Sequence, residues 1–166
     1  MPAVLKRQLL RGVGFTATGA VARPIRDRLA ELEAHTGTDV LIHGATALDD
    51  AWDAIHAHAL PPGPRLIVLL APPPGDAHAA AARAGLENLS RTLSIEWARH
   101  GIRPVTILQN GDADAAAELV AYLAGPAGGY FSGCTFTLRP PTGPRPSPPS
   151  GSPAPPRTPP GRSPTG

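Results

Sequence analysis

The sequence predicts a parallel α/β fold of the Rossmann type, because apolar runs of strand length alternate with amphipathic helical segments. The clearest strand is RLIVLL (65–70), and the clearest helix runs from about Asp76 to Arg99. An apolar run without polar alternation is typical of a strand that helices cover on both faces. Strands separated by helices pair in parallel through right-handed crossovers.

Three further strands are predicted, at DVLIH (39–43), PVTIL (104–108) and CTFTL (134–138). Each is a short run of apolar or β-branched residues bounded by turn-forming residues. Before Asp39 the sequence shows no hydrophobic run of normal strand length, so no earlier strand is expected.

The first predicted helix runs through VARPIRDRLAELEAH (21–35), with Thr16 or Thr18 as its cap. Proline at position 24 falls in the first turn, where a missing N–H costs little. Gly37 then ends the segment. The apolar residues recur at helical spacing: Val21, Ile25, Leu29 and Leu32.

Three more helices follow. One covers about Leu48 to Ala59, with acidic residues in its first turn that favour the helix dipole. The long helix from Asp76 has an apolar stripe and a C-terminal stop at His100-Gly101. Asp112 is expected to cap the last helix, through AAAELVAYLA (115–124). The stripe of the long helix consists of Ala82, Leu86, Leu89, Leu93 and Trp97.

The composition divides the chain into a folded domain (1–138) and a disordered tail (139–166). The tail consists almost entirely of Pro, Ser, Gly, Thr and Arg, so it buries too little apolar surface to offset its conformational entropy. Of the 15 basic residues four lie in the tail, which leaves 11 against the 13 acidic residues of the domain. That balance argues against nucleic-acid binding. A shifted reading frame in a GC-rich gene would also produce such a tail.

The chain is expected to be a cytoplasmic protein without a membrane segment. Cys134 is its one cysteine, so no intrachain disulfide is possible. No apolar run approaches the length that spans a bilayer, and the N-terminal apolar stretch is too short for a secretory signal. The six histidines suggest no metal site, because His56 and His58 point to different faces of a helix.

The segments AARAGLENLSRTLSIEWARHGIRPVTI (81–107) and ELVAYLAGPAGGYFSGCTFTL (118–138) go beyond a general α/β pattern. The first resembles the long helix of the short-chain dehydrogenase/reductase family, which leads through a Gly-Ile-Arg turn into the sixth strand. The second resembles the family's last helix, Tyr-x-(Ser/Thr)-Gly turn and final strand. TDVLIHGA (38–45) resembles the fourth strand and RLIVLLA the fifth. The resemblance is strongest over 81–138 and implies a shortened member.

The resemblance also implies that the catalytic groups are altered. Arg83 stands at the family's lysine position, and Ala79 stands at the position of the proton-transferring tyrosine. The expected serine falls near Ala71-Pro72, which has no hydroxyl, and the asparagine turn reads His43-Gly44-Ala45. Arginine keeps the charge but holds a ribose differently from an ammonium group. His78 is a candidate replacement acid, although it points about 100° away along the helix.

A retained NAD or NADP site would need the family's glycine-rich phosphate loop at a helix N-terminus. The glycines at positions 12, 14 and 19 have the wrong spacing for that loop. If a weak site survives, its residues are Thr16, Thr18, Gly19 and Arg83.

Three functions remain open at this stage. The preferred one is a catalytically impaired pseudoenzyme that acts as a binding, oligomerisation or regulatory subunit. It would associate with itself or with a dehydrogenase subunit through the helix over 76–99. The second is an NAD(P)-dependent oxidoreductase with an atypical active site. The third is an adaptor that recruits a partner through the Pro-rich tail, which deletion of 139–166 would test.

Overall fold

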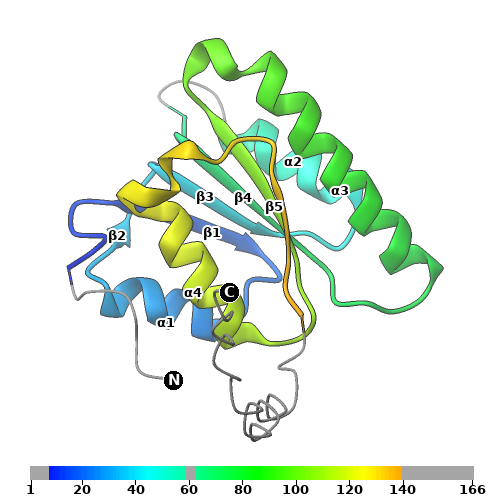
Figure 1. Ribbon diagram of the computed structural model, residues 1–166, viewed down its shortest axis with the longest axis horizontal. Coiled ribbons are helices and arrows are strands. Elements are labelled where there is room, and N and C mark those ends of the chain that lie inside the picture. Colours follow the sequence, from blue (N-terminus) through cyan, green and yellow to red (C-terminus); the bar gives the residue numbers. More distant parts are fainter. Residues whose placement is uncertain (1–7, 59–62, 140–166) are drawn as a thin grey trace, which may run out of the picture.

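Six parallel strands form one sheet in the computed structural model, which describes residues 8–58 and 63–139 (Figure 1). The strand order is β2-β1-β3-β4-β5-β6, and helices flank the sheet, so the predicted Rossmann-like fold is confirmed. The strands are β1 (Gly14–Gly19), β2 (His35–Thr36), β3 (Val40–Gly44), β4 (Leu66–Ala71), β5 (Arg103–Leu108) and β6 (Thr135–Thr137).

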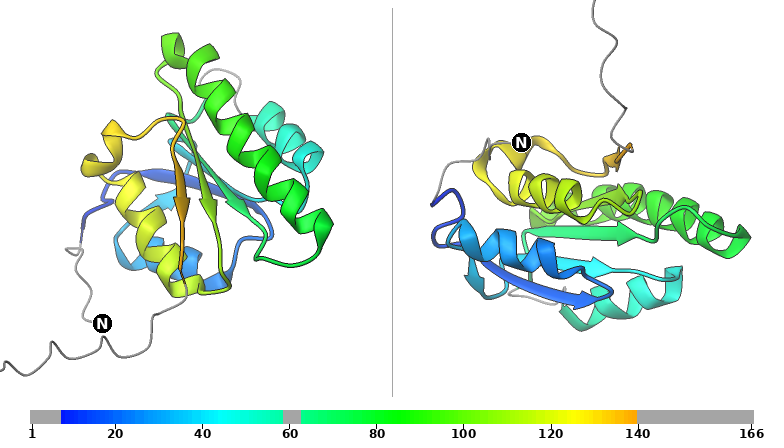
Figure 2. Two further views of the ribbon diagram at one scale, coloured as in Figure 1. Left: turned by 45° about the vertical axis from the view of Figure 1, so that its right-hand side comes forward. Right: turned by 90° about the horizontal axis from the view of Figure 1, so that it is seen from below.

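Helices cover both faces of the sheet, as both views of Figure 2 show. Helices α1 (Arg23–Glu31) and α4 (Ala113–Ala124) lie on one face, and α2 (Leu48–His58) and α3 (Ala77–Glu96) lie on the other. Two short 3₁₀ turns, η1 (Ala98–His100) and η2 (Pro126–Tyr130), precede β5 and β6.

Strand β4, which contains the longest apolar run, lies in the interior of the sheet. All of its residues are buried. Leu66, Val68 and Leu70 point into the core under α1 and α4. Ile67 and Leu69 point into the core under α2 and α3. Because both faces are covered, the strand needs an apolar side chain at every position.

The predicted cap of the last helix, Asp112, is confirmed, and Asp76 caps the long helix in the same way. The Asp76 side chain accepts a hydrogen bond from the Ala79 N–H at 2.9 Å, and Asp112 accepts one from Ala115 at 3.0 Å. Such bonds satisfy N–H groups that have no partner within the helix. Helix α3 ends at Glu96, before the predicted Arg99, where the chain tightens into η1 and turns at Gly101 with a φ of 70°.

The prediction for the N-terminal segment is wrong in two respects. Thr16 and Thr18 lie inside strand β1, and α1 begins at Arg23 with Ala22 as an N-cap that makes no side-chain bond. Phe15 and Ala17 pack against the α1–α4 core, so the segment alternates apolar and threonine residues with the period of two typical of a strand. Pro24 does fall in the first turn of α1.

The predicted first helix also ends too late, because β2 occupies His35–Thr36. From β2 the chain crosses the start of β1 to reach β3 on its other side. A Cβ on Gly14 would lie 2.8 Å from the Gly37 Cα, so this crossing depends on two glycines without side chains. Asp39 stabilises it by accepting the Gly14 N–H at 2.7 Å.

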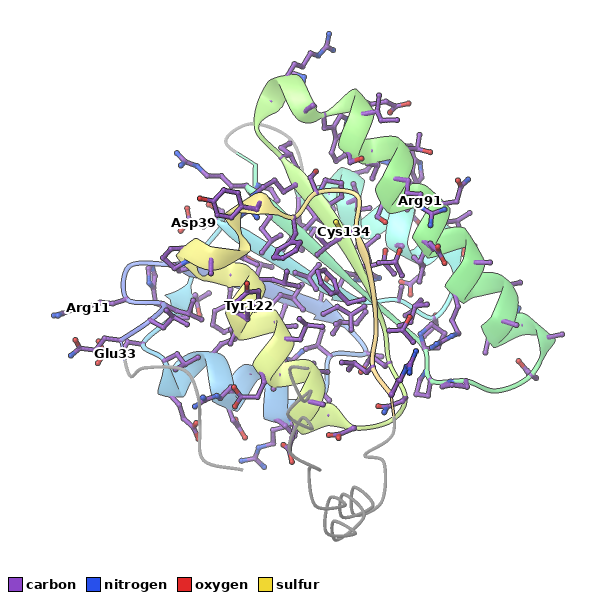
Figure 3. All side chains as sticks on the ribbon, viewed as in Figure 1. Arg11, Glu33, Asp39, Arg91, Tyr122 and Cys134 are labelled. Atoms are coloured by element: carbon purple, nitrogen blue, oxygen red, sulfur yellow. The ribbon has the colours of Figure 1, made fainter. Side chains whose placement is uncertain are left out.

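The expected disordered tail lies outside the described residues except for Arg139. Within the described part, no helix is long and apolar enough to cross a membrane. The same residues contain no cluster of three or more His, Cys, Asp or Glu side chains suited to a metal ion. Cys134 is half-buried at the start of β6, and its thiol lies 3.6 Å from the Ser132 carbonyl (Figure 3).

Candidate functional site

The carboxyl ends of β1 and β3 are the first place to look for a ligand. In open parallel sheets, ligands bind beyond the carboxyl ends of the strands, where the strand order reverses. In this sheet the chain proceeds from β1 to β2 on one side and to β3 on the other, so the reversal lies between β1 and β3.

The β1–α1 turn lies at this edge and contacts the end of β3. It has only three residues, Ala20, Val21 and Ala22, and none is a glycine. The Ala20 N–H donates to the Gly44 carbonyl at 2.9 Å, and the Val21 N–H donates to the Gly19 carbonyl at 2.9 Å. Pro24, in the first turn of the helix, has no N–H at all. Of the backbone donors at this turn, those of Ala20 and Val21 are therefore engaged, and Pro24 supplies none.

Two glycines allow the turn to lie directly against β3. A Cβ on Gly44 would lie 2.3 Å from the Ala20 carbonyl carbon, and a Cβ on Gly19 would lie 2.4 Å from the Gly44 carbonyl oxygen. Gly19 also has a φ of 67°, which side-chain-bearing residues rarely adopt. The backbones at the ends of β1 and β3 are thus in direct contact.

Three polar side chains meet beside this contact. The Thr18 hydroxyl lies 2.9 Å from His43 Nδ1, and His43 Nε2 lies 3.4 Å from Asp50 Oδ1. His43 is almost fully buried, with 2% of its surface exposed. The Thr46 backbone N–H and hydroxyl donate to Asp50 Oδ2 at 2.9 and 3.1 Å. The backbone bond from Thr46, aided by the Thr46 hydroxyl and by His43, lowers the pKa of Asp50 against the opposing effect of burial.

Arg83 acts as a clamp between two strand ends. Its Nη1 donates to the Pro72 carbonyl at 2.6 Å and to the Gln109 carbonyl at 2.8 Å. The Gln109 side chain adds a bond to the Ala71 carbonyl at 3.0 Å. Because Pro72 follows β4 and Gln109 follows β5, the guanidinium ties the carboxyl ends of these two strands together.

The other predicted catalytic positions are close to Arg83 in sequence but carry little chemistry. Ala79 is half-buried in the first turn of α3, one turn before Arg83. His78 is exposed in the same turn. Ala71 ends β4 and is fully buried, and Pro72 follows it half-buried.

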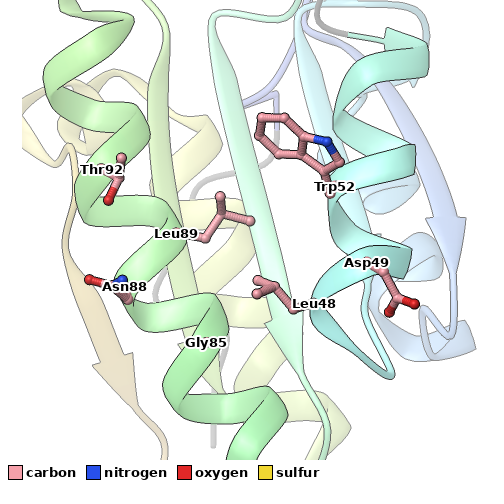
Figure 4. A pocket seen from close by; sticks show the side chains of 7 residues that line it. All are labelled: Leu48, Asp49, Trp52, Gly85, Asn88, Leu89 and Thr92. Atoms are coloured by element: carbon pink, nitrogen blue, oxygen red, sulfur yellow. The ribbon is translucent and has the colours of Figure 1, made fainter.

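A shallow apolar groove of about 410 Å³ lies away from the strand ends, between α2 and α3 (Figure 4). Leu48 and Trp52 on α2 face Leu89 on α3 across it, and Gly85 leaves space on the α3 side. Leu48 and Trp52 are 45% and 42% exposed, which is high for large apolar side chains.

Two features of the site were missed in the sequence. The sequence places His43 in an altered turn, Thr18 in a candidate phosphate loop and Asp50 in the first turn of a helix. In the structure His43 contacts both Thr18 and Asp50. A histidine within the apolar run VLIHG was the available signal, because buried polar groups require partners. The role of Gln109 had no signal in the sequence.

No protein-family profile and no curated protein sequence matches this chain. Solved structures do resemble it. A citronellol catabolism dehydrogenase of Pseudomonas aeruginosa PAO1 aligns over 83% of this chain and 98% of its own, with a TM-score of 0.61 and 16% identity. A 3-alpha-hydroxysteroid dehydrogenase from Pseudomonas sp. B-0831, solved with NADH, aligns over 75% and 94%, with a TM-score of 0.56 and 14% identity.

A short chain dehydrogenase from Bacillus anthracis aligns over 75% of this chain and 84% of its own, with a TM-score of 0.53 and 18% identity. At these identities the comparisons establish the fold alone. The chain therefore has the fold of the short-chain dehydrogenases, as its sequence predicts, in a smaller form. Among the described residues, two strands, β1 and β2, precede β3.

Proposed function

We propose that this chain is a short-chain dehydrogenase-like scaffold without hydride-transfer chemistry, which acts as a binding or oligomerisation subunit. The observation that carries the proposal is the closed turn between β1 and α1. A dinucleotide pyrophosphate needs backbone N–H groups at a helix N-terminus and glycines that allow its close approach. Here the Ala20 and Val21 N–H groups are engaged, and Ala20 lies against Gly44.

The candidate cofactor residues therefore do not fit NAD or NADP in this arrangement. Thr16 donates its hydroxyl to the Gly37 carbonyl at 2.7 Å, and Thr18 bonds to His43. The side of Gly19 on which a Cβ would stand faces the Gly44 carbonyl of β3. Arg83 is held by two backbone carbonyls.

The catalytic positions support the same proposal. Ala79 has no proton to transfer, and His78 points to solvent from the neighbouring helix position. The Arg83 guanidinium donates to the carbonyls that follow β4 and β5. A side chain engaged in this way is not free to hold a ribose. General acid catalysis requires a proton donor within hydrogen-bond distance of the reacting atom, and the α3 terminus offers none at the family position.

For the subunit role, the groove between α2 and α3 is the proposed association surface. Leu48 and Trp52 form an apolar patch with Leu89, and Ile95, further along α3, is 80% exposed. Exposed apolar patches of this kind favour protein contacts. The proposed partner is a second copy of the chain, with a dehydrogenase subunit of similar fold as the alternative.

Sedimentation of purified protein tests the association. We expect a concentration-dependent dimer that becomes monomeric in Trp52→Glu, because a buried unpaired carboxylate is costly. Tyr130→Glu is the matched control, since Tyr130 is 92% exposed on η2, away from the groove. A monomer at all concentrations, or equal dissociation of both variants, would contradict the surface.

The second candidate is an NAD(P)-dependent oxidoreductase with an atypical site. The specific observation in its favour is that the structural neighbours are dehydrogenases, one of them solved with NADH. Thermal-shift measurements with NADH and NADPH separate the two candidates. A concentration-dependent rise in melting temperature would favour the oxidoreductase, and an unchanged temperature would favour the scaffold.

A further inference from the structure

Thr18, His43 and Asp50 come from β1, β3 and the first turn of α2 and meet in a line. The hydroxyl-to-Nδ1 distance is 2.9 Å, and the Nε2-to-carboxylate distance is 3.4 Å. A hydroxyl beside an imidazole, with the imidazole oriented by a third group, is the arrangement of an activated nucleophile. Hydride transfer has no use for this arrangement.

The Asp50 carboxylate favours one tautomer of the His43 imidazole. Asp50 stays ionised because Thr46 lowers its pKa through two hydrogen bonds to Oδ2. Its Oδ1 lies 3.4 Å from His43 Nε2, a contact too long for a well-formed hydrogen bond. The negative charge still favours a proton on that nitrogen, which leaves Nδ1 as an acceptor toward the Thr18 hydroxyl. In this tautomer His43 is placed as a base for the Thr18 proton.

Thr16 makes a different hydrogen bond from Thr18, although both lie on the same face of β1. It lies two residues earlier on the same face of β1, and its hydroxyl donates to the Gly37 carbonyl at 2.7 Å. A carbonyl cannot accept a proton during a reaction. Thr18 bonds to a titratable nitrogen instead.

The hydroxyl lies beside the surface. Thr18 is half-buried, and the next two residues, Gly19 and Ala20, are exposed. Neither of these two residues has a side chain that extends beyond Cβ. A small acyl group fits such a position better than a long one.

We propose that Thr18 is a nucleophile that accepts acyl groups from small activated esters, with His43 as its base and Asp50 as a positioning residue. The Thr18 oxygen bonds to the ester carbonyl carbon while its proton passes to His43 Nδ1. The carbon–oxygen bond to the leaving alcohol breaks, and the alcohol takes that proton. The product is a threonine ester, which water hydrolyses to the acid with the same base. The step needs no oxidant and no cofactor.

The test uses the full chain and p-nitrophenyl acetate, with release of p-nitrophenol as the rate and peptide mass spectrometry as the location. We expect one acetyl group on Thr18. Because base catalysis contributes about 10²-fold or more, Thr18→Val and His43→Gln are each expected to lower the rate about 100-fold. Thr16→Val is the matched control and is expected to keep the rate. Thr18→Ser preserves the array and is expected to react.

Two readouts protect the test against variants that fail to fold. Circular dichroism reports the fold of each variant, and His43→Gln compared with Thr16→Val carries the test if Thr18→Val is unfolded. Nitrogen NMR of the His43 ring is expected to show Nδ1 without a proton in the wild type and a changed tautomer ratio in Asp50→Asn. Acetylation of Lys6 and the N-terminus in place of Thr18, or equal rates in Thr18→Ser, Thr18→Val and wild type, would overturn the proposal.

Discussion

The region from β1 to β3 and the region from β4 to β5 are built by different means. In the second region, β4 is apolar at every position and α3 packs on it through Leu86 and Leu93. In the first region, β1 presents threonines on one face, and its two ends are fixed by glycine contacts. Burial of apolar side chains stabilises the β4–β5 region, and close contact between backbones stabilises the β1–β3 region.

This difference bears on function, because the two regions flank the edge where a ligand would bind. The β4–β5 edge is tied together by Arg83, through the Pro72 and Gln109 carbonyls. The β1–β3 edge is closed by the contact of Ala20 with Gly44. Both halves of this edge thus make internal hydrogen bonds in a chain with the fold of the short-chain dehydrogenases.

The largest expected effect comes from Gly44→Ala, which attacks the β1–β3 region. The added methyl would lie 2.3 Å from the Ala20 carbonyl carbon, and backbone atoms cannot move aside as a side chain does. We expect a loss of about 3 kcal/mol or more in the free energy of unfolding, measured by urea denaturation. Gly129→Ala is the control, because a Cβ there would meet nothing within 4 Å. Equal stability of the two variants would show that the contact is not tight.

Arg83→Met is the corresponding change in the β4–β5 region. It removes a charged donor from two carbonyls and keeps much of the side-chain length. Hydrogen bonds to charged groups contribute about 1.5–3 kcal/mol, so a loss of that size is expected in urea denaturation. Arg83→Lys is expected to recover part of it. If Arg83→Met is as stable as the wild type, the two hydrogen bonds of Arg83 do not stabilise the fold.

Asp50→Asn is expected to have a smaller, pH-dependent effect. Because Thr46 lowers the pKa of Asp50 in the folded state, its contribution is present above the pKa of the unfolded chain, about 3.9. That contribution is lost as the pH falls through the lowered folded value. The stability of the wild type should therefore approach that of Asp50→Asn below about pH 4, in denaturation curves measured from pH 7 to pH 3. A constant difference over that range would contradict this linkage.

The smallest expected effect is a gain. Gly85 lies within α3, and a Cβ there would meet Leu48 at 3.5 Å, an ordinary contact. Replacing a helical glycine with alanine stabilises by about 0.5–1 kcal/mol, so Gly85→Ala should raise the melting temperature slightly. A fall in melting temperature would mean that the groove between α2 and α3 does not accept a methyl group.

The sequence predicted the β4–β5 region well and the β1–β3 region poorly, for the same physical reason. An apolar run such as LIVLLA is visible because burial on two faces dictates composition. Strand β1 is not evident in the sequence because its pattern GFTATG contains two glycines and packs only Phe15 and Ala17 against the apolar core. The alternation of Phe15 and Ala17 with two threonines was its signal. The Gly14–Gly37 crossing depends on chain geometry, which no local pattern encodes.

The candidate site divides in the same way. The alterations at Ala79 and Arg83 were visible from the resemblance, but the bonds that Arg83 makes were not. The meeting of Thr18, His43 and Asp50 requires the parallel pairing of β1 with β3, which brings position 18 beside position 43. Long-range register of this kind appears only in the folded chain.

Calorimetric titration with NADH and NADPH tests the central claim most directly. It compares the wild type with the double variant Ala79→Tyr, Arg83→Lys, which restores the family residues at both positions. Because the β1–α1 turn stays closed in both proteins, we expect no heat of binding from either. Saturable binding by the wild type would contradict the closed site, and binding gained only by the double variant would show that the residues at positions 79 and 83, rather than the turn, exclude the cofactor.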